Sequence, residues 1–229
     1  PVIPAIEVYT KRDVDELMIL DIDQSVDGTT EPDLFSITDF VKSCNVPLTY
    51  GGGIATVEDA VRVVQAGADK ILLNTHQYAN KSLISQLAKR LGSQAVVVGI
   101  DAKRLETDRH VTYSNCGTVE QKISPPEAAK IAESEGAGEI VITSIDRDGT
   151  LAGYDLELIS KITDIVSIPV IASGGAKGPG CFIDAVQKAS ASAVAAGAVF
   201  HFTALTPDDA RTAMREVGIP VRQVLHEGE

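Results

Sequence analysis

Long apolar runs are missing from the sequence. No stretch approaches the roughly 20 uncharged apolar residues that a membrane-spanning helix needs, and the first residues lack the basic start and apolar block of a signal peptide. Membrane-embedded and secreted proteins are therefore disfavoured classes, and a cytoplasmic location is expected.

Cysteine is also scarce. Cys44, Cys116 and Cys181 are odd in number and widely spaced, and they form neither a CxxC pair nor the histidine-paired spacing of a metal site. A disulfide framework and a zinc motif are thereby excluded. We expect all three cysteines to be reduced and structural, and we expect no metal and no cofactor.

Positive charge is the third shortage, because 20 Lys and Arg stand against 32 Asp and Glu and the net charge is −12. A general nucleic-acid surface needs basic patches and is disfavoured. An anionic small molecule stays an acceptable ligand, since backbone N–H groups and helix N-termini bind phosphate without net positive charge.

What the sequence does contain is a series of short apolar runs with helical patterns between them. Strands that are buried on both faces and alternate with helices indicate a parallel sheet. The runs span residues 17–22, 46–50, 71–73, 95–100, 140–143, 169–172 and 192–196. A further run at residues 2–8 brings the count to eight. A single α/β domain over residues 1–229, a (βα)8 TIM barrel, is therefore predicted rather than a doubly wound sheet.

Two segments repeat at about half the chain length. Residues 15–23 match residues 138–146, and residues 46–53 match residues 168–175. Solenoids repeat every 20 to 50 residues or so, whereas an offset of roughly 120 is expected of two fused half-barrels. We therefore predict twofold pseudosymmetry.

The N-terminal segment does not fit a count of eight strands. Too few residues separate the run at 2–8 from the next strand to form a parallel crossover. Either a loop and a helix are absent after a first strand at residues 2–8, or the first strand is absent and residues 5–12 end the first helix. We favour the first interpretation. Under either one, the first βα unit is incomplete.

Glycines follow two of the predicted strands, at the end of a barrel strand where functional loops begin. Residues 51–53 and 174–175 would let a backbone approach a phosphate closely and point N–H groups at it. One such loop can equally be a tight turn, but two at related positions favour two phosphate sites. Each is expected to act with the next strand end, at residues 74–75 and 196–197.

Carboxylates occupy the same ends: Asp21, Asp23, Asp101, Asp146 and Asp148. Any one of them can be structural, binding neighbouring N–H groups or an arginine. Asp101 stands out because it closes the fifth predicted strand and precedes a long polar excursion. A carboxylate whose pKa is raised there by burial could transfer protons.

Charged residues also precede three strands, at the face that barrels use for stability. Glu16, Lys70 and Glu139 lie there together with Asp69. Taken by themselves, these residues predict a structural ring of ion pairs at the bottom of the barrel.

A series of colinear motifs lies at residues 47–54, 67–70, 74–75, 92–98, 100–104, 136–139, 143–150, 153–155, 171–175 and 199–202. Through these motifs the sequence, from about residue 15 to residue 222, resembles the cyclase subunit of imidazole glycerol phosphate synthase. The resemblance implies a lyase-cyclase reaction. In it, ammonia from a partner glutaminase converts a phosphoribulosyl formimino aminoimidazole carboxamide nucleotide to imidazole glycerol phosphate and aminoimidazole carboxamide ribotide.

The resemblance also assigns site residues. Asp101 maps onto an acid-base group, and Glu7 maps onto a first-strand aspartate if residues 2–8 are a strand. The implied phosphate-binding residues are Gly53, Asn74 and Thr75 for one site, and Asp148, Gly149, Gly175, Ala196 and Gly197 for the other. The basal residues Glu16, Lys70 and Glu139 become a gate for ammonia along the barrel axis, with the glutaminase docked at that N-terminal face.

Two alternatives stay open. A similar group of glutaminase-linked barrels delivers ammonia in the synthesis of amidino sugars of surface polysaccharides, and residues 21–23, 31–33, 49–51 and 191–197 favour it. Thr143 and residues 101–104 and 218–222 favour histidine biosynthesis, which we place first. The third possibility is a barrel that binds phosphate without turnover.

Overall fold

The computed structural model describes residues 2–22, 31–107 and 109–223, and it contains one curled sheet. Its parallel strands run in chain order, with each strand beside the next. They are β1 (Leu17–Leu20), β2 (Leu48–Gly51), β3 (Lys70–Leu73), β4 (Val96–Arg104), β7 (Glu139–Ser144), β8 (Val170–Ser173) and β9 (Ala193–Val194). A doubly wound sheet would reverse its strand order at one point. The predicted barrel-type fold and the seven later strands are confirmed.

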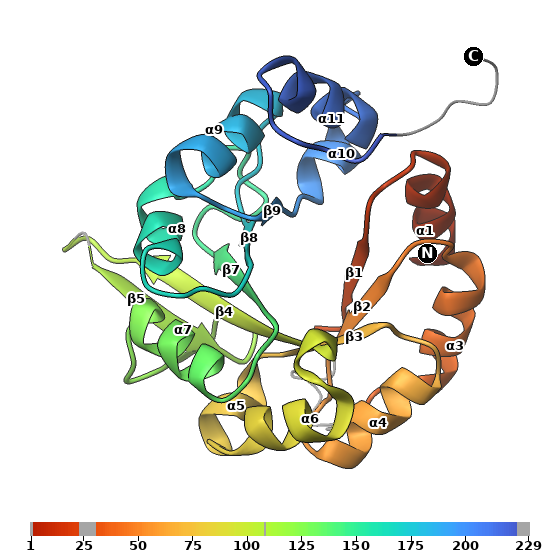
Figure 1. The fold of residues 1–229 in the computed structure, drawn as a ribbon, viewed down its shortest axis with the longest axis vertical. Helices are drawn as coiled ribbons and strands as arrows, with labels where there is room; N and C mark the ends of the chain where they lie inside the picture. The colour runs from red at the N-terminus through yellow and green to blue at the C-terminus, as the bar shows by residue number, and fades with distance from the viewer. Residues whose placement is uncertain (1, 23–30, 108, 224–229) are drawn as a thin grey trace.

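Helices cover the outer face of this sheet (Figure 1). They are α1 (Val2–Lys11), α3 (Leu34–Ser43), α4 (Val57–Gln65), α5 (Thr75–Ala79), α6 (Leu83–Leu91), α7 (Pro125–Ser134), α8 (Leu156–Thr163), α9 (Pro179–Ala189), α10 (Ala198–Phe202) and α11 (Pro207–Glu216), with a 3-10 turn η1 (Ser93–Ala95). Polar caps set several of their starts. The Thr56 side chain, for example, accepts the N–H of Asp59 and forms a capping box with it at α4. No helix in the described residues is long and apolar enough to cross a membrane.

Alternate residues of each strand pack on opposite sides of the sheet. In β4, Val96, Val98 and Ile100 belong to the main core between strands and helices, whereas Val97 packs inside the curled sheet against Leu72 and Val141. The period of two in side-chain direction produces this division. It explains why the strands are apolar on both faces.

The polar excursion after Asp101 is an antiparallel hairpin. β4 continues beyond the barrel and pairs with β5 (His110–Ser114), which pairs with β6 (Val119–Glu120). In the β4–β5 register Asp101 lies opposite Tyr113, and Arg104 lies opposite His110. The sequence indicated a long loop here but not its strands.

The favoured interpretation of the N-terminal segment, a first strand at residues 2–8, was wrong. Residues 2–8 belong to helix α1, not to a strand, and the second interpretation, in which residues 5–12 end a helix, is the better description. Ile6 is buried while Ala5 and Tyr9 are half-buried, so the covered stripe has a helical spacing rather than the alternation of a strand. Within the described residues β1 pairs with β2 alone and β9 pairs with β8 alone, so the sheet stays open between β1 and β9.

Side chains from the two ends of the chain meet beside this opening. Tyr9 of α1 packs edge-on against Phe200 and His201 of α10, at centroid distances of 6.5 and 5.4 Å. Arg211 of α11, which is 3% exposed, donates to the carbonyl oxygen of Asp13. These contacts connect the two ends of the chain, whose helices α1 and α11 lie on either side of the opening in Figure 1.

The predicted pseudosymmetry is visible in the hydrogen bonds at the strand starts. The Leu17 N–H donates to the Pro47 carbonyl at 2.9 Å, and the Ile140 N–H donates to the Pro169 carbonyl at 2.9 Å. These two contacts occupy matching places in the internal sequence repeat. The halves β1–β3 and β7–β9 are therefore built alike.

Candidate active site

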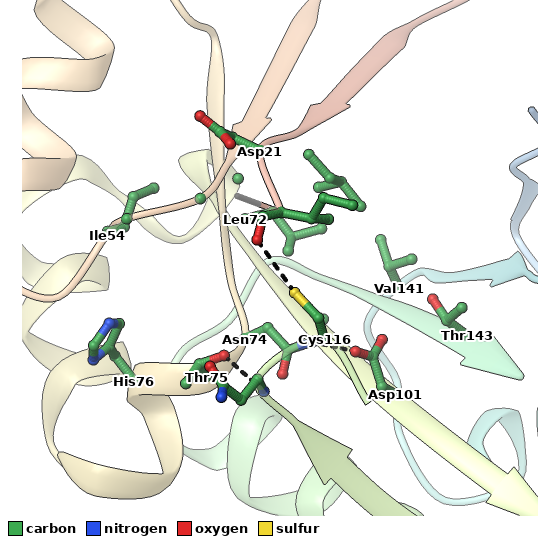
Figure 2. A pocket seen from close by; sticks show the side chains of 17 residues that line it. Asp21, Ile54, Leu72, Asn74, Thr75, His76, Asp101, Cys116, Val141 and Thr143 are labelled. Atoms are coloured by element: carbon green, nitrogen blue, oxygen red, sulfur yellow. Dashed lines mark hydrogen bonds between the residues drawn. The ribbon is translucent and has the colours of Figure 1, made fainter. Parts of the chain in front are cut away.

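A cavity of about 240 Å³ lies at the C-terminal ends of β1 to β4 and β7, where barrel enzymes hold their catalytic residues (Figure 2). It is lined by Leu20, Asp21, Ile22, Gly51, Gly52, Gly53, Ile54, Leu72, Asn74, Thr75, His76, Gly99, Asp101, Asn115, Cys116, Val141 and Thr143. The cavity thus contains the first glycine loop, the first predicted phosphate set and Asp101.

The glycine loop of the cavity admits no side chain. A Cβ at Gly52 would lie 2.6 Å from the carbonyl oxygen of Asp21, and one at Gly53 would lie 2.8 Å from the backbone of Glu31. Both glycines also have positive φ angles, 132° and 65°. Bare backbone therefore forms this wall of the cavity, as close approach to a phosphate requires.

Asp101 is held in place by a neighbour from the next strand end. The Asn74 Nδ2 group donates to Asp101 Oδ2 at 2.9 Å. Burial raises the pKa of Asp101 to about 6, with the Asn74 bond opposing this shift and the Asp148 carboxylate adding to it. Such a carboxyl group can both accept and donate a proton near neutral pH. The Asn74 Oδ1 atom is buried without a hydrogen-bond partner among the described residues.

The other candidate carboxylates differ in their surroundings. Asp21 accepts the Tyr50 hydroxyl at 3.3 Å, and burial together with the Asp21 charge raises the pKa of Tyr50. Asp146 accepts the Ser144 hydroxyl at 3.2 Å, which agrees with a structural role. Asp148 is exposed, and Asp23 lies outside the described residues.

The tip of the β5–β6 hairpin closes one side of the cavity. The Asn115 N–H donates to Thr75 Oγ1 at 3.1 Å, and Cys116 Sγ lies 3.5 Å from the Ile22 carbonyl oxygen. All three cysteines are free; Cys44 and Cys181 are half-buried, whereas Cys116 is exposed on the cavity wall. Asn115 and Cys116 were missed as site residues, although an Asn-Cys-Gly turn inside the polar excursion was a usable signal.

The second predicted phosphate set does not line this cavity. Its residues are Asp148, Gly149, Gly175, Ala196 and Gly197. Their loops do contact one another, since the Gly153 N–H donates to the Gly175 carbonyl at 2.7 Å and the Tyr154 hydroxyl donates to the Ala195 carbonyl at 2.9 Å. Phosphate binding by either set stays a prediction.

A buried charge cluster under the hairpin was not expected from the sequence. Asp155, whose side chain is 2% exposed, accepts Arg104 Nη2 at 3.0 Å and lies 3.0 Å from His110 Nε2. Burial alone would raise the pKa of Asp155, but the bonds from Arg104 and His110 outweigh it and lower this pKa to about 2. The cluster ties the hairpin to the start of α8.

Glu7, the second catalytic candidate, lies outside the cavity. It lies on α1 with an exposed side chain. Its assignment required a first strand at residues 2–8, which the helix replaces. Glu7 is therefore withdrawn as a catalytic residue.

The basal residues do meet at the opposite face. Lys70 Nζ lies 3.0 Å from Glu16 Oε2 and 2.8 Å from Glu139 Oε1. Burial would lower the pKa of Lys70, but its bonds to the two glutamates raise it. Asp69 accepts the Leu48 N–H at 2.8 Å. The predicted ion-pair cluster is confirmed, and its role as a gate stays a prediction.

Known proteins resemble the chain over nearly its full length. A family profile described as "Histidine biosynthesis protein" matches residues 1–206. The imidazole glycerol phosphate synthase subunit HisF of Hyphomonas neptunium is 42% identical over 216 residues, which are 94% of this chain and 85% of that protein. The putative imidazole glycerol phosphate synthase subunit hisF2 of Campylobacter jejuni is 41% identical over 215 residues, 94% of this chain and 84% of that protein.

Proposed function

The chain belongs to the histidine biosynthesis protein family, and from this we propose that it is the cyclase subunit of an imidazole glycerol phosphate synthase. The reaction would use ammonia to cleave and cyclise a phosphoribulosyl formimino aminoimidazole carboxamide nucleotide. Imidazole glycerol phosphate and aminoimidazole carboxamide ribotide would leave.

The observation that carries this proposal is Asp101 in the cavity. Its carboxyl group lines the same cavity as the glycine loop after β2, accepts a hydrogen bond from Asn74, and has a pKa raised to about 6. Ring closure needs protons to be removed from one atom and supplied to another, and one carboxyl group with such a pKa can do both. The glycine loop would hold a phosphate and thereby fix the reacting atoms beside Asp101.

The test is turnover with ammonium salt alone, so that no glutaminase is needed. The wild-type chain is expected to consume the nucleotide and release both products. Asp101→Asn keeps the shape of the side chain and its contact with Asn74 but cannot exchange protons, so turnover should fall by about two orders of magnitude or more. Nucleotide affinity should change little. Wild-type levels of turnover in this variant would remove Asp101 from the mechanism.

A partner glutaminase would dock at the N-terminal face of the sheet. The Glu16, Lys70 and Glu139 cluster lies on that face, opposite the cavity. Between the two, the inside of the sheet is lined by apolar side chains, among them Leu72 and Val97. A small neutral molecule such as ammonia would pass along such a wall more readily than an ion.

A second candidate is an ammonia-using barrel that acts on a sugar precursor of surface polysaccharides. The Tyr50 and Asp21 contact at the cavity rim favours it, because these residues lie in two of the segments that resemble that group. Product analysis separates the candidates. If this chain restores growth of a histidine auxotroph that lacks its own cyclase, the result would support histidine biosynthesis. If it does not restore growth, although the chain is folded and uses ammonium, the result would favour the second candidate.

A further inference from the structure

The cavity combines a predicted phosphate site with an unfavourable charge. Of its lining residues in the described part of the chain, none is Lys or Arg, while Asp21 and Asp101 are carboxylates. A phosphate placed here would be repelled by Asp21 in particular, and in a partly buried cavity such repulsion is weakly screened. Neutral backbone donors alone would have to offset it.

Among the described residues that line the cavity, His76 is the one whose side chain can carry a positive charge. It directly follows Asn74 and Thr75 and lies in the first turn of α5. Figure 2 shows its side chain pointing from that helix toward Ile54, in the loop that follows Gly53. His76 therefore adjoins one segment predicted to hold a phosphate and points toward the loop that follows the other.

Neither nitrogen of the His76 ring has a hydrogen-bond or ion-pair partner among the described residues. The other two described histidines that bear on the fold are engaged: His110 contacts Asp155 at 3.0 Å, and His201 packs on Tyr9. A half-buried imidazole facing a cavity with both nitrogens unused is available to a ligand.

A second donor stands beside it. Thr75 Oγ1 accepts the Asn115 N–H at 3.1 Å, so its hydroxyl hydrogen remains to be donated. We propose that His76 is an additional ligand of the phosphate held by Gly53 and Thr75, and that its imidazolium supplies the positive charge that the cavity otherwise lacks. This inference rests on the proposed function, since it assumes that a phosphate binds in this cavity.

Cys116 offers a reporter for the test, because it lines the same cavity and is exposed. The full chain is titrated with inorganic phosphate, and the rate of Cys116 alkylation is followed by peptide mass spectrometry, with Cys44 and Cys181 as internal references. Phosphate in the cavity should slow alkylation of Cys116 alone. The apparent Kd of phosphate follows from this protection.

Three variants separate charge from fold. His76→Gln keeps an N–H donor without a charge and should weaken phosphate roughly tenfold, the scale of one lost charge-assisted hydrogen bond. His76→Lys restores a cation and should keep the Kd near the wild-type value. His201→Gln, a histidine outside the cavity, should leave it unchanged. Melting temperatures without phosphate show that each variant is folded.

The outcomes distinguish this inference from its premise. Protection of Cys116 that is equal in wild type and His76→Gln would overturn the role of His76 while leaving the phosphate site standing. Equal losses in His76→Gln and His76→Lys would overturn the role of charge. Absence of any protection in the wild type would overturn both the phosphate site and the inference built on it.

Discussion

Asp101 shows at the scale of one residue how catalysis and stability oppose each other. Its pKa in the folded chain is raised to about 6 by burial, so the folded state holds the proton more tightly than the unfolded state does. The sign follows from linkage: the favourable contribution is complete below about pH 4, the unfolded value, and is lost as pH rises through about 6. At pH 8 the ionised side chain is therefore a net cost.

Asp101→Asn should accordingly stabilise the fold at alkaline pH while it removes turnover. With a pKa of about 6 in the folded chain against about 4 in the unfolded chain, the gain at pH 8 is at most roughly 3 kcal/mol, and it should shrink toward pH 4. Urea unfolding of both proteins at several pH values measures it. Asp164→Asn, an exposed carboxylate after α8, is the control and should show no such trend. A gain that does not depend on pH would contradict the assignment.

Residues at strand ends were the ones that the sequence located well. Asp101, Asn74, Thr75 and Gly53 each follow an apolar run, and all four line the cavity. His76 was passed over although it adjoins Thr75, because a histidine next to a polar turn has no pattern of its own. Glu7 was misplaced because its role required a strand that is a helix.

At the scale of elements, the β5–β6 hairpin after β4 connects the cavity to the buried Asp155 cluster. It carries Asn115 and Cys116 to the cavity while its base is fixed by the Asp155 cluster. Among the described residues His110 Nδ1 is buried without a partner, so the Asp155 contact is the bond that holds this ring. In addition to the backbone pairing of β4 with β5, one buried carboxylate therefore fixes the base of the hairpin.

Asp155→Asn should loosen the hairpin. The amide can still cap α8 through its oxygen, but the charge that pairs with Arg104 is gone, and removing one partner of a buried ion pair costs about 3 kcal/mol or more. Because the pKa of Asp155 is lowered to about 2, its contribution is present above about pH 4 and fades as pH falls toward 2. Denaturant unfolding at pH 7 and pH 3 measures both effects.

Glu157→Gln is the matched control for Asp155→Asn. Glu157 also accepts Arg104 Nη2, at 2.8 Å, but its side chain is 47% exposed. Water replaces such a partner readily, so the loss should be much smaller than that in Asp155→Asn. Similar losses in the two variants would show that Asp155 acts as an ordinary surface charge.

The sequence predicted an element correctly where the length of an apolar run and its periodicity indicated the same kind of structure. The continuous apolar runs specified the seven parallel strands, since no half-exposed strand has that pattern. The run at residues 2–8 was ambiguous, because a short apolar segment fits a buried strand and a helix equally well. The β5–β6 hairpin escaped prediction because its strands are held by the register with β4 and by the Arg104 and Asp155 contacts, which the sequence does not reveal.

On the scale of the whole molecule, the two halves share a backbone plan but not a site. The cavity is lined by β1 to β3 with the loops that follow them, and by residues from β4, the hairpin and β7: Gly99, Asp101, Asn115, Cys116, Val141 and Thr143. Lys70 lies on the N-terminal face of the sheet, opposite the cavity, with a side chain that is 17% exposed.

Lys70→Ala tests whether the basal cluster gates ammonia. If it does, ammonium-driven turnover should remain near the wild-type value, because ammonium from solution enters at the open cavity. Glutamine-driven turnover with a partner glutaminase should fall severalfold per glutamine hydrolysed, since that ammonia has to cross the cluster. The ratio of product to glutamate, measured beside the ammonium assay, reports the coupling.

The structural role of the same cluster predicts a different pattern. Glu139 is 16% exposed, so removal of Lys70 leaves a half-buried carboxylate without its cation and destabilises the fold. Both assays would then decline together with the melting temperature, and the ratio of product to glutamate would hold. Lys89→Ala, an exposed lysine near the end of α6, should change neither assay and controls for loss of charge alone. A changed ratio in Lys70→Ala with an unchanged melting temperature is the result that only a gate explains.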